Sequence, residues 1–223
     1  MMSQTQREPR LPAEYQEVEY LERTDVTSSG PYIITNIYGD NTLDFSIKAM
    51  CYDYVARTYF GSRRNYDVPD AKIYNLVSGQ GGSDRQYGRF GFGNHVWYYW
   101  PAINNIANEI FTAQKVGDTV TSSGGANFSV AGETEFSTPY TLEIFAMSTS
   151  TQSRHNLEGL NGRIYSLSFS RNRTLIADFV PCYRKADNKP GMYDLCGSIC
   201  DLTNSPFYVS ANNGEFTIGQ NVT

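Results

Sequence analysis

The sequence carries little charge and lacks any long apolar run. Charged residues make up 18% of its 223 residues and apolar residues 40%, a balance typical of a folded globular chain rather than a disordered one. No stretch approaches the ~20 consecutive apolar residues of a membrane-spanning helix. Basic residues never cluster beyond the pairs at 63–64 and 184–185, and the net charge is −5. These features argue against a nucleic-acid ligand and against membrane insertion.

Histidine and cysteine are also scarce, which limits the chemistry open to the chain. Neither His95 nor His155 accompanies a nucleophile motif, and no glycine-rich stretch has the pattern of a phosphate-binding loop. The N-terminus lacks the apolar stretch of a secretory signal, so we expect cytoplasmic synthesis and free thiols at Cys51, Cys182, Cys196 and Cys200. The last two cysteines are too far apart for a typical zinc knuckle. We therefore expect no metal and no cofactor.

Aromatic residues and glycine are plentiful instead. The chain has 17 tyrosines, 12 phenylalanines and 19 glycines, and Ser, Thr and Asn are also frequent. Tyr, Phe and Thr favour β-strands, whereas Gly and Asn favour turns. The composition predicts an all-β protein.

Alternating apolar and polar residues in three segments predict half-buried strands. The side chains expected to share a face are Leu43, Phe45, Ile47, Ala49 and Cys51 in the first segment; Tyr140, Leu142, Ile144 and Ala146 in the second; and Tyr165, Leu167 and Phe169 in the third. In the third segment the opposite face is expected to carry Ile164, Ser166, Ser168 and Ser170.

The remaining strand signals predict one domain. Residues 162–180 read as a hairpin with its turn at 170–174, and shorter strands are predicted at 32–37, 58–63, 71–77, 87–93 and 207–210. Isoleucines at 103, 106 and 110 have helical spacing, but in an all-β chain we predict a strand from Asn108 onward. Dense strands without alternating helices favour a sandwich of two antiparallel sheets. We predict this sandwich at 11–223, after a polar arm at 1–10.

The last third of the chain resembles a known protein family. The segment "GRIYSLSFSRNRTLIADFVPCYRKADNKPGMYDL" is similar to the C-terminal block of concanavalin A-like lectin/glucanase (laminin G-like) domains of bacteriophage and prophage virion proteins. The matching motifs lie at 162–165, 178–182, 191–194, 207–208 and 214–216. "LPAEYQEVEYLERT" followed by "YIIT" is similar to the family's opening strands, so the resemblance covers about 11–219. Longer loops at "DVTSSG" and "CGSICDLTNS" depart from the pattern, and such loops are where binding surfaces vary.

The resemblance implies a jelly-roll sandwich whose first and last strands pair. It places the "DFVPCYRKADNKPGMYD" stretch in the architecture of the fold. Because proline cannot donate to a strand ladder, we expect Pro181 at a strand end. We expect Gly191 to supply a tight turn, with Met192 and Tyr193 covering the open end of the core.

The sharpest candidate for a ligand site is "HVWYYWP". Four aromatic side chains in an extended segment can stack on sugar rings or dock against protein: Trp97, Tyr98, Tyr99 and Trp100. Burial of all four between the sheets or under a loop is the alternative.

Catalysis and cation binding have weaker signals. Retaining glucanases of this class need two carboxylates ~5–5.5 Å apart. Glu17 and Glu19 are the pair of residues that comes nearest to this requirement. These two belong to a strand that the family uses for structure, so we read them as surface charges and predict no catalytic residues. Asp40, Asn41 and Asp44 carry oxygen ligands for Ca²⁺ but no spacing signature, and a turn is the better interpretation.

The polar arm is a second candidate site. Residues 1–10 carry almost no apolar surface with which to pack on the sandwich. We predict a docking peptide for a neighbouring subunit, with Arg7 and Arg10 near acidic groups of that partner and Pro9 keeping the chain extended.

Three functions follow as hypotheses. The first is a non-enzymatic virion protein, such as a capsid decoration, fibre or tail appendage, assembled in the host cytoplasm with other virion proteins, in a homo-oligomer, and able to contact host or mucosal glycans. The second is a carbohydrate-binding, lectin-like module of a bacterial surface or prophage protein. A glycoside hydrolase of the glucanase type is the weakest.

Overall fold

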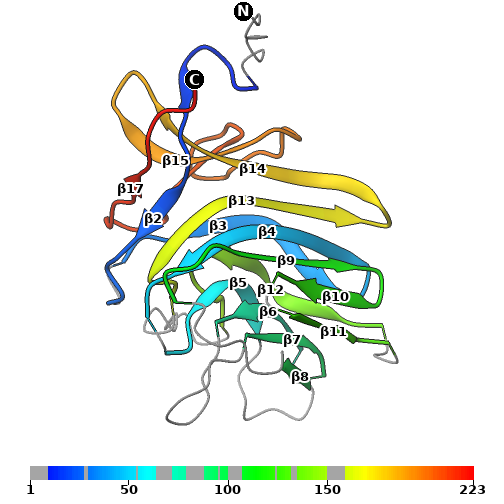
Figure 1. Cartoon of the computed structure of the whole chain (residues 1–223). Coiled ribbons are helices and arrows are strands. Elements are labelled where there is room, and N and C mark those ends of the chain that lie inside the picture. Colours follow the sequence, from blue (N-terminus) through cyan, green and yellow to red (C-terminus); the bar gives the residue numbers. More distant parts are fainter. Residues whose placement is uncertain are drawn as a thin grey trace, which may run out of the picture.

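The computed structural model describes residues 10–27, 30–53, 55–63, 72–78, 88–94, 96–99, 107–123, 125–131, 135–149 and 159–223. The regular elements of this part of the chain are all strands, and they form two antiparallel sheets (Figure 1). No helix in it is long and apolar enough to cross a membrane. The prediction of an all-β, two-sheet protein is confirmed, while the jelly-roll connection order stays a prediction.

The 11-stranded sheet, called the large sheet below, follows the order β11-β10-β9-β4-β13-β14-β15-β16. Short strands at both ends of the chain complete it, because β1 pairs with β14 and β2 lies between β13 and β17. Its strands are β1 (Tyr15–Glu17), β2 (Leu21–Arg23), β4 (Leu43–Cys51), β9 (Phe111–Val116), β10 (Thr119–Ser122), β11 (Gly125–Ser129), β13 (Gly162–Arg171), β14 (Thr174–Arg184), β15 (Lys189–Asp194), β16 (Phe207–Val209) and β17 (Thr217–Ile218). The expected pairing of the first and last strands is not what these ladders show, because the first strand, β1, pairs with β14, whereas the last, β17, pairs with the second strand, β2.

The second sheet, called the small sheet below, has six strands in the order β3-β12-β5-β6-β7-β8. These strands are β3 (Ile33–Asp40), β5 (Thr58–Arg63), β6 (Ile73–Val77), β7 (Arg89–Gly93), β8 (Val96–Tyr99) and β12 (Ser137–Ile144). The strands predicted at 32–37, 58–63, 71–77 and 87–93 correspond to β3, β5, β6 and β7. The strand predicted from Asn108 is β9, which begins at Phe111.

Aromatic rings from both sheets meet in the core. Phe45 of β4 lies 5.1 Å from Phe60 of β5 and 5.4 Å from Phe90 of β7, measured between ring centroids. Phe169 of β13 packs edge-on against Phe60 at 5.2 Å. Edge-to-face contacts of this kind add stability beyond the apolar area that they bury. The alternation predicted for 43–51 is confirmed, because its five apolar side chains are all buried in this core.

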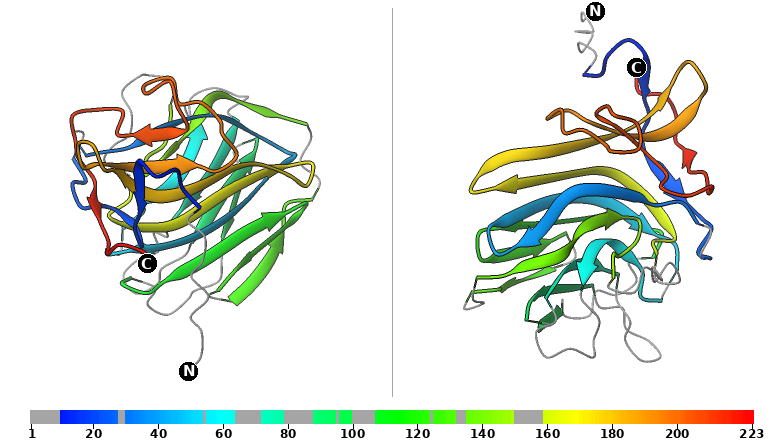
Figure 2. Two further views of the ribbon diagram at one scale, coloured as in Figure 1. Left: turned by 90° about the horizontal axis from the view of Figure 1, so that it is seen from above. Right: turned by 180° about the vertical axis from the view of Figure 1, so that it is seen from behind.

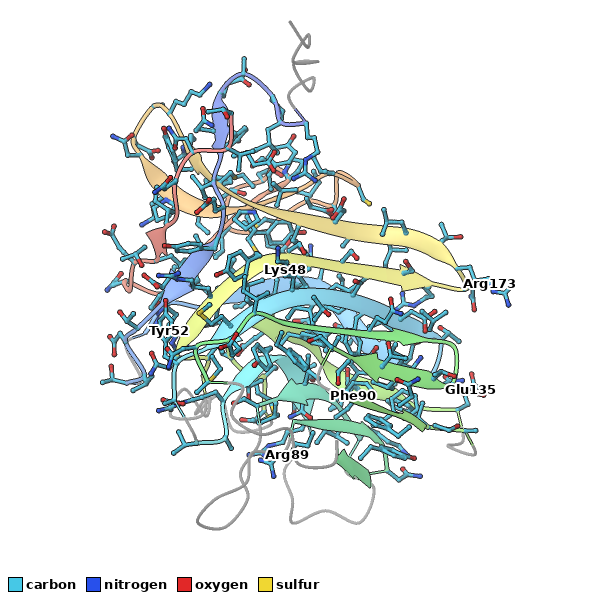
Figure 3. The ribbon with its side chains drawn as sticks, viewed as in Figure 1. Lys48, Tyr52, Arg89, Phe90, Glu135 and Arg173 are labelled. Carbon is cyan, nitrogen blue, oxygen red and sulfur yellow. The ribbon has the colours of Figure 1, made fainter. Side chains whose placement is uncertain are left out.

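The hairpin predicted at 162–180 is present, with β13 and β14 joined by Asn172 and Arg173 (Figure 2). Both residues have positive φ angles, 50° and 66°, as two-residue turns of the favoured hand require. Arg173 lies at the tip of this hairpin (Figure 3).

The face assignment predicted for β13 is wrong at its first half. The pairing with β4 shifts between Ile164 and Ser166, so that one extra residue is inserted as a β-bulge. Ile164 is therefore buried in the core together with Leu167 and Phe169, although strict alternation places it on the opposite face. Tyr165 turns to the outer face of the large sheet.

Pro181 lies inside β14 and not at a strand end. It is the register partner of Met192, and its carbonyl accepts a hydrogen bond of 3.0 Å from the Val18 amide. The N–H and C=O of one residue face the same neighbour in an antiparallel strand, so the missing N–H faces Val18. At this point β14 changes its partner from β13, which ends its pairing at Phe179, to β1, which begins at Cys182. No ladder bond with β15 is lost.

Gly191 also lies within a strand instead of a tight turn. A Cβ atom at this position would come within 2.2 Å of the Tyr208 carbonyl oxygen and 2.8 Å of the Phe207 ring. Glycine here permits the close approach of β16 to β15. The turn before it uses Asn188, whose φ is 55°. Met192 is fully buried in the core, and the ring of Tyr193 contacts Tyr15 at 4.9 Å.

Candidate functional site

The outer face of the large sheet is polar and open over β4 and β9. In β4 the residues between the buried ones are Ser46 and Lys48, and in β9 they are Thr112 and Gln114, all of them exposed. Register pairs Ser46 with Gln114 and Lys48 with Thr112, which places the four side chains side by side. Hydroxyl, amide and ammonium groups therefore cover the middle of this face.

Two tyrosines and two cations form a row beside these polar groups. The Lys48 ammonium lies 5.3 Å from the centre of the Tyr165 ring, and that ring meets Tyr20 edge-on at 5.5 Å. The guanidinium of Arg163 then lies 4.0 Å from the centre of the Tyr20 ring. Contacts between a cation and an aromatic face contribute about 0.5–1 kcal/mol each at exposed sites. We call these four residues the tyrosine row.

Glu22 holds one end of the tyrosine row in place. Its Oε1 atom accepts a hydrogen bond of 2.8 Å from Arg163 Nε and also contacts the Tyr52 hydroxyl, and its Oε2 accepts one of 2.6 Å from Thr217 Oγ1. Burial alone raises the pKa of Glu22, but the three hydrogen bonds bring that pKa below its ordinary value. The carboxylate therefore stays charged and fixes Arg163 over Tyr20.

The tyrosine row lines one hollow, and a second hollow adjoins it. A cavity of about 570 Å³ is lined by the row together with Glu19, Ile110 and Ser166. Another of about 320 Å³ is lined by Ser46, Thr112, Ala113, Gln114, Thr121, Ser122 and Ser123. The two meet where Lys48 pairs with Thr112 in register. Side by side they extend across the sheet from β10 to Tyr20, just before β2, and both volumes lie within the usual range for ligand sites. We call the two adjoining hollows the outer groove.

The tyrosine row escaped the sequence analysis for a local reason. Alternation with Leu167 and Phe169 predicts an inward Tyr165, and only the bulge before Ser166 turns that ring outward. Tyr20 lies in the connection between β1 and β2, outside any alternating pattern. The residues of the bulge, 164–166, include no glycine or proline that would indicate it in the sequence.

The predicted aromatic site lies only partly within the described residues. Tyr98 of β8 packs on the core, and its ring stacks on Phe128 with 5.5 Å between centroids and 6° between planes. Both rings are half-buried, so this stacking covers one face of Tyr98. For Trp97 and Tyr99 the structure describes the backbone of β8 alone, and Trp100 lies outside the described residues.

Of the three arm residues, Arg7 and Pro9 lie outside the described residues, whereas Arg10 is placed. The Arg10 guanidinium forms an ion pair with Glu17 of its own chain. The hydrogen bond with Glu17 raises the pKa of Arg10. Arg10 and Glu17 also line a cavity of about 380 Å³ that includes Val222 and Thr223. Docking of the arm to a partner stays a prediction.

All but one of the carboxylates considered for catalysis and cation binding have structural partners in the described residues. Glu17 is paired with Arg10, and Glu19 is exposed. Asp40 accepts hydrogen bonds from the amide and hydroxyl of Thr42, so the turn interpretation of this segment is confirmed. Asp44 pairs with the buried Lys115, 3.0 Å between Nζ and Oδ1. Within the described residues, no group of three or more His, Cys, Asp or Glu side chains could hold a metal ion.

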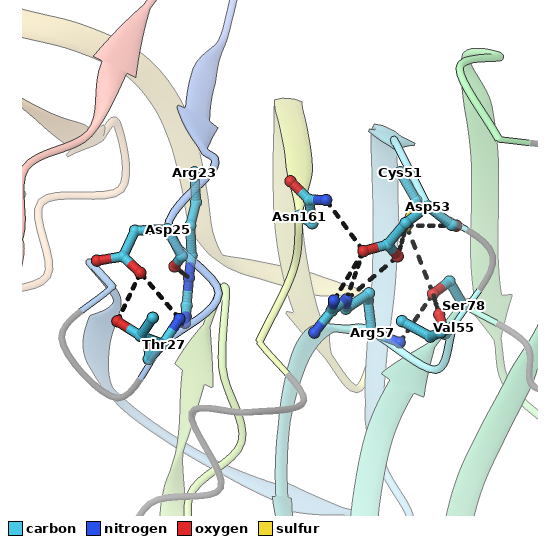
Figure 4. A network of polar contacts seen from close by, with 9 residues as sticks. All are labelled: Arg23, Asp25, Thr27, Cys51, Asp53, Val55, Arg57, Ser78 and Asn161. Carbon is cyan, nitrogen blue, oxygen red and sulfur yellow. Dashed lines mark hydrogen bonds and ion pairs between the residues drawn. The ribbon is translucent and has the colours of Figure 1, made fainter.

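A polar network at one end of the sandwich looks reactive but is structural (Figure 4). The Cys51 thiol contacts Asp53 and Ser78, and Asp53 forms an ion pair of 2.7 Å with Arg57. Burial raises the pKa of Cys51 to about 11, so the thiol stays protonated and unreactive at neutral pH. Asn161 completes the network with a 3.0 Å hydrogen bond to Asp53, which ties the start of β13 to the loop after β4.

Arg23, which Figure 4 shows beside this network, also has a structural role. Its buried guanidinium donates to three backbone carbonyls, those of Asp25, Thr27 and Phe145. Burial lowers its pKa to about 10, which still leaves it charged. All four thiols of the chain are free, as predicted, and only Cys196 is exposed.

No family model matches the sequence, and no curated protein matches it.

Proposed function

We propose that this chain is a non-enzymatic structural protein of a bacteriophage particle, and that it contacts host-surface glycans through the outer groove. The observation that carries the glycan part is the tyrosine row, which places two rings and two cations beside a strip of hydroxyl and amide groups. The virion part rests on the sequence resemblance to concanavalin A-like virion domains.

Sugars fit the chemistry of the outer groove better than apolar ligands do. A sugar ring has an apolar face that stacks on an aromatic ring and a rim of hydroxyls that needs hydrogen-bond partners. Tyr20 and Tyr165 are half-buried and held by Arg163 and Lys48, so little rotamer freedom remains to be lost on binding. Ser46, Thr112 and Gln114 and their neighbours supply the polar partners.

Binding without cleavage is the better proposal for this groove. Glycoside hydrolysis requires two carboxyl groups, about 5–5.5 Å apart in retaining enzymes and about 6.5–9.5 Å apart in inverting ones. Among the residues that line the two hollows, Glu19 alone carries a carboxyl group. A glucanase-type hydrolase would need a second acid here.

A glycan array tests the binding proposal. We expect the wild type to bind a subset of glycans, and the double variant Tyr20→Ala, Tyr165→Ala to lose that binding at least tenfold. Tyr38→Ala is the matched control, because Tyr38 is 47% exposed on β3 of the small sheet. Thermal unfolding of each variant verifies that the fold is intact. Absence of binding to every glycan, or binding that both tyrosine changes leave intact, would contradict the proposal.

Where the chain is found distinguishes the two hypotheses, a virion protein and a lectin-like module of a bacterial surface. Both would use the same groove. Mass spectrometry of purified particles should detect the chain in fixed stoichiometry with the other virion proteins. Detection in the bacterial envelope and not in particles would favour the surface module.

A further inference from the structure

The outer groove holds one cation that can select among glycans, and this role rests on the proposed glycan-binding function. That cation is Lys48, labelled in Figure 3, whose side chain is exposed where the two hollows meet. Its ammonium lies over the Tyr165 ring, 5.3 Å from the ring centre, and no ion pair of the described residues includes it.

Neighbouring cations of the large sheet are neutralised within the chain. Arg163 pairs with Glu22 at 2.8 Å, and Lys115, which faces inward from β9, pairs with Asp44 at 3.0 Å. Arg171 at the far end of β13 pairs with Asp40 at 2.9 Å. Lys48 therefore differs from its neighbours, because its positive charge remains available to a ligand.

Hydrogen-bond donors flank this charge on both sides. Register places Thr112 of β9 on one side of Lys48 and Ser166 of β13 on the other, and both side chains are exposed. An ammonium with two hydroxyls beside it provides a set of donors for one anionic group. The Tyr165 ring next to it would support the sugar that carries this group.

The surroundings limit how much negative charge the ligand can have. Glu19 lines the same hollow beyond the tyrosine pair, since β2 and the residues before it lie on the side of β13 opposite to β4. The chain as a whole has a net charge of −5, which repels a densely charged polyanion at long range. A ligand with isolated anionic groups matches this distribution, and a heavily sulfated chain or a nucleic acid does not.

We propose that the outer groove selects a sugar chain that is largely neutral but carries single anionic substituents, carboxylate or phosphate, one of which binds Lys48. The Tyr20–Tyr165 pair then holds the adjacent neutral part of the chain. Selection by charge at one position adds specificity to the sugar contacts of the proposed function.

The experiment uses matched ligands. Oligosaccharides that contain uronic acid or neuraminic acid are compared, by calorimetry, with the same oligosaccharides after reduction of their carboxyl groups to alcohols. A phosphate-bearing oligosaccharide and its dephosphorylated form make a second pair. We expect the wild type to prefer the anionic member of at least one pair by about tenfold, the usual effect of one hydrogen-bonded charge. The pair that gives this preference identifies the anion.

Variants then assign the preference to its residue. Lys48→Gln should remove the preference, because it should lower the affinity for the anionic member far more than that for the neutral member. Lys185→Gln is the control, because Lys185 lies away from the groove, where it bonds the Ala13 carbonyl. Raising the salt concentration should weaken the binding of the anionic ligand and leave that of the neutral ligand unchanged.

The outcomes separate the two proposals. Equal affinity for the members of every pair, or a preference that survives Lys48→Gln, overturns the anionic inference and leaves the glycan proposal standing. If the chain binds no member of any pair, the result counts against both the glycan proposal and the anionic inference.

Discussion

The outer faces of the two sheets differ sharply in how far their strands are exposed. In the large sheet, β4 and β9 alternate between buried and exposed residues, and the exposed ones form the outer groove. In the small sheet, β5 and β6 are buried along their whole length. Asn75 of β6, between the core residues Tyr74 and Leu76, points away from the core and is nonetheless fully buried.

The returning chain after β12 covers part of the outer face of the small sheet. Phe145 has a φ of 67° and ends the strand, and Ser148 then pairs with β5 through the Arg63 amide and the Gly61 carbonyl. Met147 from this return accepts a 2.9 Å hydrogen bond from the Asn75 amide. The outer face of β4 and β9 is thus open, whereas that of β5 and β6 is used for internal packing, where added volume and charge are costly.

The largest effect should come from adding one carbon to the packed face. A Cβ at Gly61 would lie 2.2 Å from the Cβ of Asn75 on the next strand. Gly61→Ala should therefore lower the free energy of unfolding by about 3 kcal/mol, since the strands must move apart. Ser46→Thr adds one carbon to the open face and should change it by less than about 0.5 kcal/mol. Denaturant unfolding measures both, and equal effects would erase the difference between the faces.

Substitution of two lysines, Lys115 and Lys48, tests how the inner and outer faces of the large sheet differ. Lys115 is buried and donates to the carbonyls of Asn41 and Leu43 as well as to Asp44. Lys115→Met leaves these acceptors without their donor and should cost about 2 kcal/mol. Lys48→Met should be nearly neutral for stability. Chemical denaturation of the two variants tests this, and an unchanged midpoint for Lys115→Met would contradict it.

Glu143 makes the packed face sensitive to pH. It is 4% exposed in β12, and burial raises its pKa to about 8. In the unfolded chain the carboxyl ionises near 4.5, so the folded state binds the extra proton between these two values. Stability should fall by roughly 1 kcal/mol as the pH rises from 6 to 7, with no further loss above about 8. Unfolding of the wild type and Glu143→Gln at both pH values should show the dependence in the wild type alone. Glu109→Gln, at an exposed position, should retain it.

The smallest effect concerns the thiols and leaves the fold intact. Burial raises the pKa of Cys51 to about 11 and that of Cys182 to about 12, and Cys200 is also buried. A thiol reagent at pH 8 should modify Cys196 in the native protein and the other three only after denaturation. Peptide mapping identifies the labelled positions. Rapid native labelling of Cys182 would show that the β14–β15 region opens more readily than its burial implies.

Sequence reasoning succeeded where one face is buried and one is open. The five alternating residues of β4 and the tight β13–β14 turn follow from local pattern. It failed where a long-range contact decides the local geometry. The bulge beside Ser166, the glycine at 191 and the position of Pro181 each depend on a neighbouring strand that is distant in sequence. The outer groove was missed for the same reason, because its tyrosines are brought together by the bulge and by the pairing of β2 with β13.

The pairing of the chain's two ends has a mechanical consequence. Val18 bridges Asn221, and Leu21 and Glu22 pair with Ile218 and Thr217 in antiparallel register. Tension applied at residues 10 and 223 therefore acts at the same end of this ladder (Figure 1). Its hydrogen bonds would be loaded one after another, as in a zipper, and not all at once in shear. Under such a load β17 should peel away first, at low force, while the long β4, β13 and β14 stay paired.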